Sequence, residues 1–289
     1  MGTNQQRREA AKRKLERQLA RRAERAKRRK IIGIGAAVGV VVLAAGLIVV
    51  LTGQDDEGAA NAQGEPSSSA APSEEGPSEE ISIPDQRVEP AERSEPLPNP
   101  TDCEYPEGGE AAKQVDPPNG QGISSQGTVE MTLSSTAGDI PVTLDRSLAP
   151  CAVNSFEHLA EQDYFTDTTC HRLGTQGLQM LQCGDPTGQG AGGPGYTFAD
   201  ETFDELTYGR GILAMANAGP DTNGSQFFMV YGEASALPPD YTVFGTISDE
   251  GLKVLDEVAK AGHDGSLDPS PGGGKPNTEV RFTDVTVSQ

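Results

Sequence analysis

The feature that most constrains the fold of this chain is an apolar run from Ile31 to Leu51, within a total of 289 residues. The run has 21 residues, all Ile, Val, Leu, Ala or Gly. As a helix it would extend over roughly 30 Å, the thickness of the hydrocarbon core of a bilayer. We therefore expect a transmembrane helix over 31–51.

The charges on either side of the run indicate its orientation. Residues 1–30 hold 13 Lys and Arg against 3 Glu, whereas Asp55, Asp56 and Glu57 follow the run. The positive-inside rule then predicts a single-pass protein of the cell membrane, with residues 1–30 as a basic cytoplasmic segment and the rest extracytoplasmic. A cleaved signal peptide is the alternative, but its apolar core would have about 7 to 15 residues.

The basic segment predicts contact with anionic lipid headgroups. Binding to nucleic acid or to the ribosome is the alternative for such a segment. We expect membrane lipid as the partner and no nucleic acid.

Composition divides the residues after the apolar run, 52–289, into three segments. Residues 52–100 are rich in Ser, Pro, Glu and Ala and lack aromatic residues, so they predict a disordered acidic linker. Residues 101–125 contain Pro117, Pro118 and Cys103, and we interpret them as an arm on the folded domain. Residues 126–289 form that domain, with 23 acidic and 7 basic side chains.

Short β-type runs separated by Gly, Asp and Pro turns fill the domain. Strands are predicted at 128–135, 139–145, 169–174, 178–184, 211–216, 225–231, 242–247 and 279–287. Helices are predicted at 150–162 and 250–260 from apolar residues at helical spacing. This pattern predicts a mainly β fold, a closed eight-stranded antiparallel barrel capped by two helices.

Two segments carry a family resemblance: CHRLGTQGLQMLQCGDPTGQGAGGPGYTFADE at 170–201 and GILAMANAGPDTNGSQFFMV at 211–230. They resemble the signatures of the cyclophilin family, and the whole chain resembles its membrane-anchored, exported bacterial type. The resemblance covers about 126–289. It implies a cyclophilin-like barrel with a substrate groove on its outer face, and peptidyl-prolyl cis-trans isomerase activity.

That reaction has a barrier of about 18 to 20 kcal/mol, set by amide conjugation, and it needs no nucleophile, metal or cofactor. In the twisted amide the prolyl nitrogen becomes a better hydrogen-bond acceptor, so a fixed cationic donor stabilises it. Arg172 is the candidate donor. By resemblance Gln226 orients the substrate, and His171 gives hydrogen-bonding support.

The resemblance also implies the residues that bind a proline-containing polypeptide. The backbone of Asn217, with Ala216 beside it, would hold the extended peptide. The walls of the proline pocket would be Phe228, Met180 and Leu237, with Tyr241 at the groove edge. Phe227, next to Phe228 on the strand, should face the core.

The turn after Arg172 departs from the family pattern, because it is two residues longer and lacks the usual pocket aromatic. Leu178 takes that aromatic's place in one alignment and Gln179 in another. We prefer Leu178, and Gln182 then assists Arg172.

Four cysteines in an exported domain make two disulfides plausible. Cys170 and Cys183 flank the long turn, which favours a bridge between them and leaves Cys103 to pair with Cys151. A zinc site at Cys170, His171 and Cys183 is the alternative, but it lacks a known ligand spacing.

These features favour an isomerase with a monomeric catalytic domain that assists the folding of exported proteins. A catalytically weak proline-peptide binding module tethered to the membrane is the alternative. A third reading is a structural envelope protein, for which Arg172→Ala would be silent.

Overall fold

The computed structural model describes residues 81–287, in which eight strands form one antiparallel sheet of order β3-β4-β6-β5-β7-β2-β1-β8. The elements are β1 (Thr128–Ser135), β2 (Gly138–Asp145), α2 (Pro150–Glu161), β3 (Arg172–Gly174), β4 (Met180–Cys183), β5 (Ile212–Met215), β6 (Phe227–Val230), β7 (Val243–Ile247), α3 (Asp249–Ala261) and β8 (Phe282–Val287). The prediction of eight antiparallel strands and two helices is confirmed.

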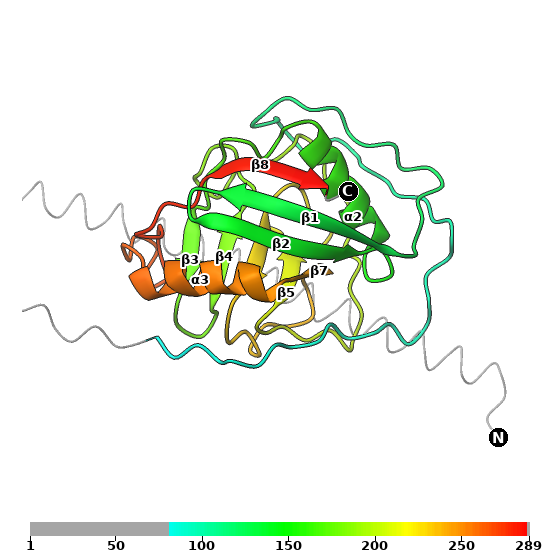
Figure 1. Ribbon diagram of the computed structural model, residues 1–289. Coiled ribbons are helices and arrows are strands. Elements are labelled where there is room, and N and C mark those ends of the chain that lie inside the picture. Colours follow the sequence, from blue (N-terminus) through cyan, green and yellow to red (C-terminus); the bar gives the residue numbers. More distant parts are fainter. Residues whose placement is uncertain (1–80, 288–289) are drawn as a thin grey trace, which may run out of the picture. The chain divides into compact units, whose positions relative to one another are not determined.

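The sheet curls into a half-barrel but does not close (Figure 1). Its edge strands are β3 and β8, which do not pair with each other. The segment before β3 reaches the start of β8 through the bridge between Thr169 and Arg281 and through main-chain hydrogen bonds such as that from the Phe282 amide to the Thr168 carbonyl at 2.9 Å. The prediction of a closed barrel is wrong in this respect. The outer edge of β3 is taken instead by a loop, because Leu173 forms a bridge with Gly274.

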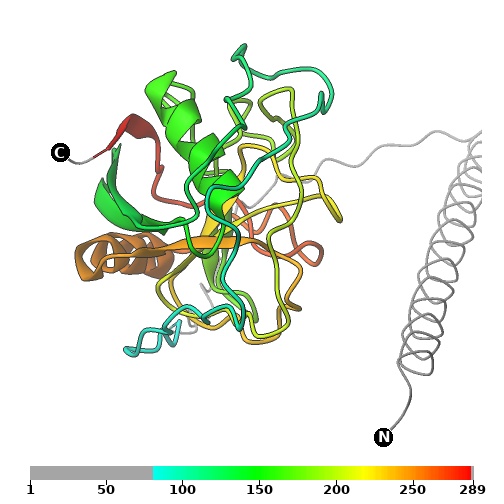
Figure 2. The ribbon, with the colours of Figure 1, turned by 90° about the vertical axis from the view of Figure 1, so that its right-hand side faces the viewer.

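The two helices lie on opposite sides of the curled sheet (Figures 1 and 2). Helix α2 begins with Pro150, where the missing N–H of proline costs nothing. Helix α3 begins after Ser248, whose side chain accepts a hydrogen bond from the Gly251 amide at 3.1 Å. It ends at Gly262, which has the positive φ of 73° that glycine tolerates best.

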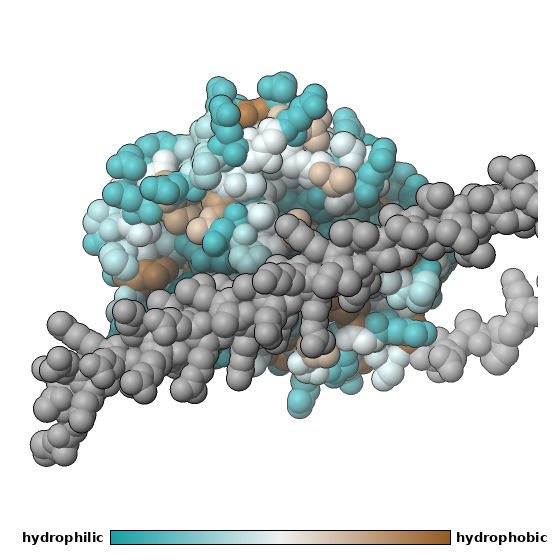
Figure 3. Space-filling view, turned by 180° about the vertical axis from the view of Figure 1, so that it is seen from behind, coloured by the Kyte–Doolittle hydropathy of each residue, from teal (hydrophilic) through white to brown (hydrophobic). Residues whose placement is uncertain are grey.

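An aromatic cluster fills the core between α2 and the sheet. The ring centroid of Phe227 lies 5.1 Å from that of Phe156, 5.8 Å from Phe165 and 6.1 Å from Phe282. Phe227 is completely buried, which confirms that it faces the core. On the face shown in Figure 3, hydrophobic residues form small, separate patches, and Val287 is the one exposed large hydrophobic side chain among the described residues.

Residues 81–100, which we call the strap, run along the outside of the domain (Figure 1). The Val88 amide donates to the carbonyl of Arg210 at 2.8 Å. Farther along, the Arg93 guanidinium donates to the carbonyls of Leu148 at 2.8 Å and Glu201 at 2.6 Å, and it lies 4.6 Å from the centroid of the Phe203 ring.

The prediction of a disordered linker is therefore wrong for residues 81–100. Composition shows that a segment cannot build a core of its own, but the strap needs none. It binds the surface of the folded domain through main-chain hydrogen bonds and through two arginines. These are Arg93 and Arg87, and Arg87 pairs with Asp249 at 2.9 Å.

The arm, residues 101–125, is bound to the domain at Cys103, Tyr105 and Lys113. Cys103 is bonded to Cys151 at the start of α2, and the Tyr105 hydroxyl donates to the Cys151 carbonyl at 2.8 Å. Farther on, the Lys113 ammonium donates to the carbonyl of Asp163 at 2.6 Å. The second disulfide joins Cys170 to Cys183, so both bridges pair as the sequence suggested.

Loss of the Cys103–Cys151 bridge should destabilise the domain. The bridge spans 48 residues, and the chain entropy of an open loop of that length corresponds to about 4 kcal/mol. Changing both residues to serine should lower the free energy of unfolding, measured by urea denaturation, by about that amount. The matched control is the Cys170/Cys183 serine pair, which spans 13 residues and should cost about 3 kcal/mol. A loss below about 1 kcal/mol for the first pair would contradict the expectation.

The predicted basic segment, the transmembrane helix and the linker up to residue 80 lie outside the described residues. Within residues 81–287 there is no helix with the length and apolar character needed to cross a bilayer.

Candidate active site

Three side chains form a row across adjacent strands of the sheet. In the register of the ladder, Arg172 on β3 pairs with Gln182 on β4, and Gln182 pairs with Phe228 on β6. Paired residues on neighbouring strands point to the same face. Their chain neighbours Leu173, Leu181 and Phe227 therefore point to the core face, and all three are completely buried.

A loop after α3 holds the Arg172 side chain. Its Nε donates to the carbonyl of Gly272 at 3.0 Å, and its Nη2 donates to the carbonyl of Pro271 at 2.8 Å. Burial lowers the pKa of Arg172, and Tyr241 opposes this shift. Because a guanidinium has five N–H donors, hydrogens on Nη1 and Nη2 stay available for a substrate.

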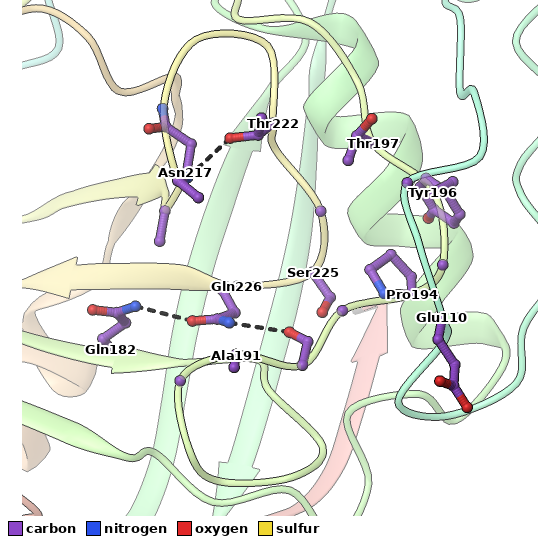
Figure 4. Close-up of a pocket in the computed structure, with 18 residues that line it drawn as sticks. Glu110, Gln182, Ala191, Pro194, Tyr196, Thr197, Asn217, Thr222, Ser225 and Gln226 are labelled. Atoms are coloured by element: carbon purple, nitrogen blue, oxygen red, sulfur yellow. Dashed lines mark hydrogen bonds between the residues drawn. The ribbon is translucent and has the colours of Figure 1, made fainter. Parts of the chain in front are cut away.

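A chain of amides continues from Arg172 across the sheet face. Nη1 of Arg172 makes a long contact of 3.5 Å with Oε1 of Gln182. Nε2 of Gln182 donates to Oε1 of Gln226 at 3.0 Å, and Nε2 of Gln226 donates to the carbonyl of Gly192 at 3.0 Å. Figure 4 shows this line from Gln182 through Gln226. The chain fixes the orientation of both amides, so the structure brings Arg172, Gln182 and Gln226 together as the sequence predicted.

Apolar residues continue the row beyond Gln182. The Phe228 ring packs edge to face on Tyr241, with centroids 5.7 Å apart, and Phe228 is 5% exposed. Met180 lies two residues from Gln182 on β4 and so shares its face. Leu237 is partly buried and packs against the same core. The roles of Phe228, Met180 and Leu237 as walls of a proline pocket, and of Tyr241 at the groove edge, stay predictions.

The long turn between β3 and β4 bears on whether Leu178 or Gln179 takes the place of the missing pocket aromatic. The Gln179 side chain is nearly buried; its Oε1 accepts from the Glu233 amide at 2.7 Å and its Nε2 donates to the carbonyl of Ser82 at 3.0 Å. Gln179 is therefore a structural residue, and the alternative that places it in the pocket is wrong. Leu178 is partly buried against the core, and its contact with a substrate stays a prediction.

The Asn217 side chain is fixed, whereas its main chain is free. Nδ2 donates to the carbonyl of Asp240 at 2.9 Å, and Oδ1 accepts from the Gly219 amide at 3.2 Å. The preceding residue, Ala216, donates its amide to the carbonyl of Gln226 at 2.9 Å. Among the described residues, no partner hydrogen-bonds to the amide or carbonyl of Asn217. Exposed main-chain groups of this kind suit an extended peptide.

His171 does not have the role that the resemblance implied. Both ring nitrogens are buried, and neither has a hydrogen-bond partner among the described residues. Burial lowers the pKa of His171, and the Arg172 charge lowers it further while Asp185 opposes. The imidazole is therefore neutral at pH 7, and the expectation of hydrogen-bonding support is wrong. Its chain neighbour Arg172 faces the groove, so the ring is directed away from it.

A cavity of about 580 Å³ adjoins the row beside Gln226 and Asn217 (Figure 4). Its wall includes residues 190–197, the loop 216–218, and Gly108 and Glu110 of the arm. The sequence identified neither the arm residues nor the carbonyls of Pro271 and Gly272 as part of the site. No pattern marks them, because their contribution depends on where main-chain atoms meet in space.

Cys170 and Cys183 are bonded to each other, so neither sulfur is a thiolate that could bind zinc. No other group of three potential ligands from His, Cys, Asp and Glu gathers within residues 81–287.

A curled eight-stranded sheet with two helices, carrying an arginine, two glutamines and a phenylalanine on its outer face, defines a cyclophilin-type domain. The family model described as cyclophilin type peptidyl-prolyl cis-trans isomerase/CLD matches residues 128–287. The chain therefore belongs to the cyclophilin family.

Individual relatives agree with this assignment. The chain is 47% identical over 200 residues to the probable peptidyl-prolyl cis-trans isomerase B of Mycobacterium tuberculosis, a match that covers 64% of this chain and 63% of that relative. It is 39% identical over 178 residues to peptidyl-prolyl cis-trans isomerase A of the same organism, covering 56% and 93%. It thus spans less than two thirds of the first relative.

Among solved structures, a cyclophilin type peptidyl-prolyl cis-trans isomerase of Cryptosporidium parvum is similar. It shares 33% sequence identity at a TM-score of 0.50, covering 56% of this chain and 99% of that one.

Proposed function

We propose that this chain is a membrane-anchored peptidyl-prolyl cis-trans isomerase that assists the folding of exported proteins. The observation that carries the proposal is the row of Arg172, Gln182 and Phe228 on one face of the sheet. It sets a fixed cationic donor and an aromatic ring on one surface, as catalysis at a prolyl amide requires.

The row and its neighbours can bind the proline, hold the peptide and stabilise the twisted amide. The proline ring enters beside Phe228 and Tyr241, where burial of one ring contributes on the order of 1 to 2 kcal/mol. The main chain of Asn217 holds the extended peptide. As the X-Pro bond twists, the prolyl nitrogen gains a lone pair, and an N–H of Arg172 donates to it. Because this bond is strong only in the twisted state, it lowers the barrier.

The anchor and the compartment are argued from the sequence. The apolar run 31–51 follows the basic residues 1–30 and precedes an acidic segment, which favours an exported domain. Two disulfides support this location, because they persist in oxidising compartments. Protease added to spheroplasts that express the full chain should remove the domain and spare the basic segment. A domain protected until the membrane is lysed would contradict the proposed topology.

The activity is tested by NMR exchange spectroscopy on a short X-Pro peptide. The full chain in detergent, with its disulfides formed, should accelerate exchange between the cis and trans peptides. Binding without faster exchange would overturn the isomerase and favour a tethered proline-recognition module. This second candidate is favoured by the altered turn at 174–182, which lacks an aromatic residue.

A further inference from the structure

We propose that Asp268 and His263 are positioning residues for the isomerase reaction. They hold the loop of residues 263–275, which we call the clamp loop, against Arg172, and the clamp loop directs the remaining N–H groups of the guanidinium toward the substrate. The inference rests on the proposed isomerase function, because it concerns the donor that acts on the twisted amide. Neither residue lines the cavity beside Gln226.

The clamp loop lies beside β3, in the segment between α3 and β8 (Figure 1). The Leu173 amide donates to the Gly274 carbonyl at 2.7 Å, and the Gly274 amide donates back to the Leu173 carbonyl at 3.1 Å. The two residues before Gly274 but one, Pro271 and Gly272, supply the carbonyls that bind the Arg172 guanidinium. The clamp loop is thus bonded both to the arginine side chain and to the main chain of the next residue.

Asp268 closes the turn that presents these two carbonyls. Its Oδ1 accepts a hydrogen bond from the Gly273 amide at 2.8 Å. Two main-chain bonds lie alongside, from Leu267 to Gly273 at 3.1 Å and from Gly272 to Leu267 at 3.0 Å. Gly273 has a φ of 85°, which glycine tolerates best, and a Cβ on it would collide with the Leu173 carbonyl. Because the Asp268 side chain is exposed, its role is this hydrogen bond and not packing.

His263 joins the other end of the clamp loop to the turn after β3. Its Nε2 lies 3.0 Å from Oγ1 of Thr175, which follows Arg172 by three residues. Its Nδ1 accepts from the Gly265 amide at 3.0 Å, so in the neutral ring Nε2 carries the proton and donates to Thr175. The clamp loop is therefore attached on both sides of the turn that presents its carbonyls.

This attachment matters because little else fixes the guanidinium. A long side chain with several rotatable bonds populates many rotamers unless its surroundings select one. The contact of Arg172 with Gln182 on the opposite edge is long, at 3.5 Å, whereas the contacts with the clamp loop are 2.8 and 3.0 Å. A donor that is already in place needs no reorganisation as the amide twists. The rate should therefore depend on side chains that never touch the substrate.

The test uses the full chain in zwitterionic detergent, with its disulfides formed, and a short X-Pro peptide. NMR exchange gives kcat/KM, and a separate titration gives peptide affinity. Asp268→Ala should lower kcat/KM about fivefold, the usual effect of one hydrogen bond, and change affinity less than about twofold. His263→Ala should lower kcat/KM by about threefold, and the two changes together by more than about tenfold, because each removes one attachment of the same loop.

Two variants serve as controls. Asp268→Asn loses the charge but keeps an oxygen acceptor for the Gly273 amide, so it should retain more than about half of the parent kcat/KM. Glu279→Ala removes a nearby exposed carboxylate whose ion pair is with Arg281 and not with the clamp loop, and it should leave kcat/KM unchanged.

A double-mutant cycle separates positioning of Arg172 from a general structural effect. In the Arg172→Ala chain, Asp268→Ala should change the residual kcat/KM by less than about 1.5-fold. The Arg172 Nε–H resonance, identified by its loss in Arg172→Ala, gives a readout that does not depend on activity. Its hydrogen exchange with water should be faster in Asp268→Ala than in Asp268→Asn, because the bond to Gly272 opens more often.

Full activity in Asp268→Ala, equal impairment in Asp268→Asn, or the same loss in the Arg172→Ala chain would overturn the inference. If the parent chain itself fails to accelerate exchange, the isomerase function fails, and the Nε–H exchange rates still decide whether Asp268 holds Arg172 in place.

Discussion

Arg172→Ala should lower kcat/KM for an X-Pro peptide by about 10²- to 10³-fold, the usual effect of removing one preorganised donor that acts on the transition state. Peptide affinity should change far less, because Phe228 and the Asn217 main chain remain. The Pro271 and Gly272 carbonyls fix the guanidinium, so its remaining N–H groups are preorganised for the prolyl nitrogen of the twisted amide.

NMR exchange under subsaturating peptide, with a separate titration for affinity, measures both quantities. Arg172→Lys should also be strongly impaired. A lysine ammonium lacks the planar fork of donors with which the guanidinium binds two fixed carbonyls and the substrate at the same time. Arg281→Ala is the control, because Arg281 pairs with Asp167 at the surface and does not line the cavity. If Arg172→Ala keeps more than a third of the activity, the proposed mechanism is wrong.

Phe227→Ala should lower the free energy of unfolding by about 3 to 5 kcal/mol, as removal of a buried phenyl ring usually does. Its ring contacts the aromatic rings of Phe156, Phe165 and Phe282, so the change empties the centre of the core. Urea denaturation measures the loss. The kcat/KM of the fraction that remains folded should stay close to that of the parent chain.

The adjacent Phe228 is the matched variant for this prediction. Its ring lies on the groove face against Tyr241, so Phe228→Ala should raise KM by removing a wall of the proline pocket. If both variants lost stability equally and neither changed KM, the assignment of the two faces of β6 would be refuted.

The sequence predicted the parts of this molecule that depend on local pattern. Short β-type runs predicted β1 and β2, and apolar residues at helical spacing predicted α2. The motifs around Arg172 and Gln226 identified the central site residues, because a fixed register brings them together whenever the family fold forms.

Features that depend on contacts between distant segments could not be predicted in this way. Composition gave no sign that Arg93 would find the carbonyls of Leu148 and Glu201, or that Gln179 would turn inward to bind Ser82 and Glu233. His171 showed the same limit, since only the packing around Gly190 shows that its ring nitrogens lack partners. Closure of the barrel was overestimated because nothing in the sequence placed Gly274 beside Leu173.

The strap has a consequence for the order of events during synthesis. Arg87 precedes its partner Asp249 by 162 residues, and Arg93 precedes Glu201 by 108. The ribosome synthesises the strap before the residues that it binds. Contacts between residues so far apart in the sequence form slowly. The first segment of the domain to emerge is thus among the last to settle, and until then its docking surface is open to other chains or to chaperones.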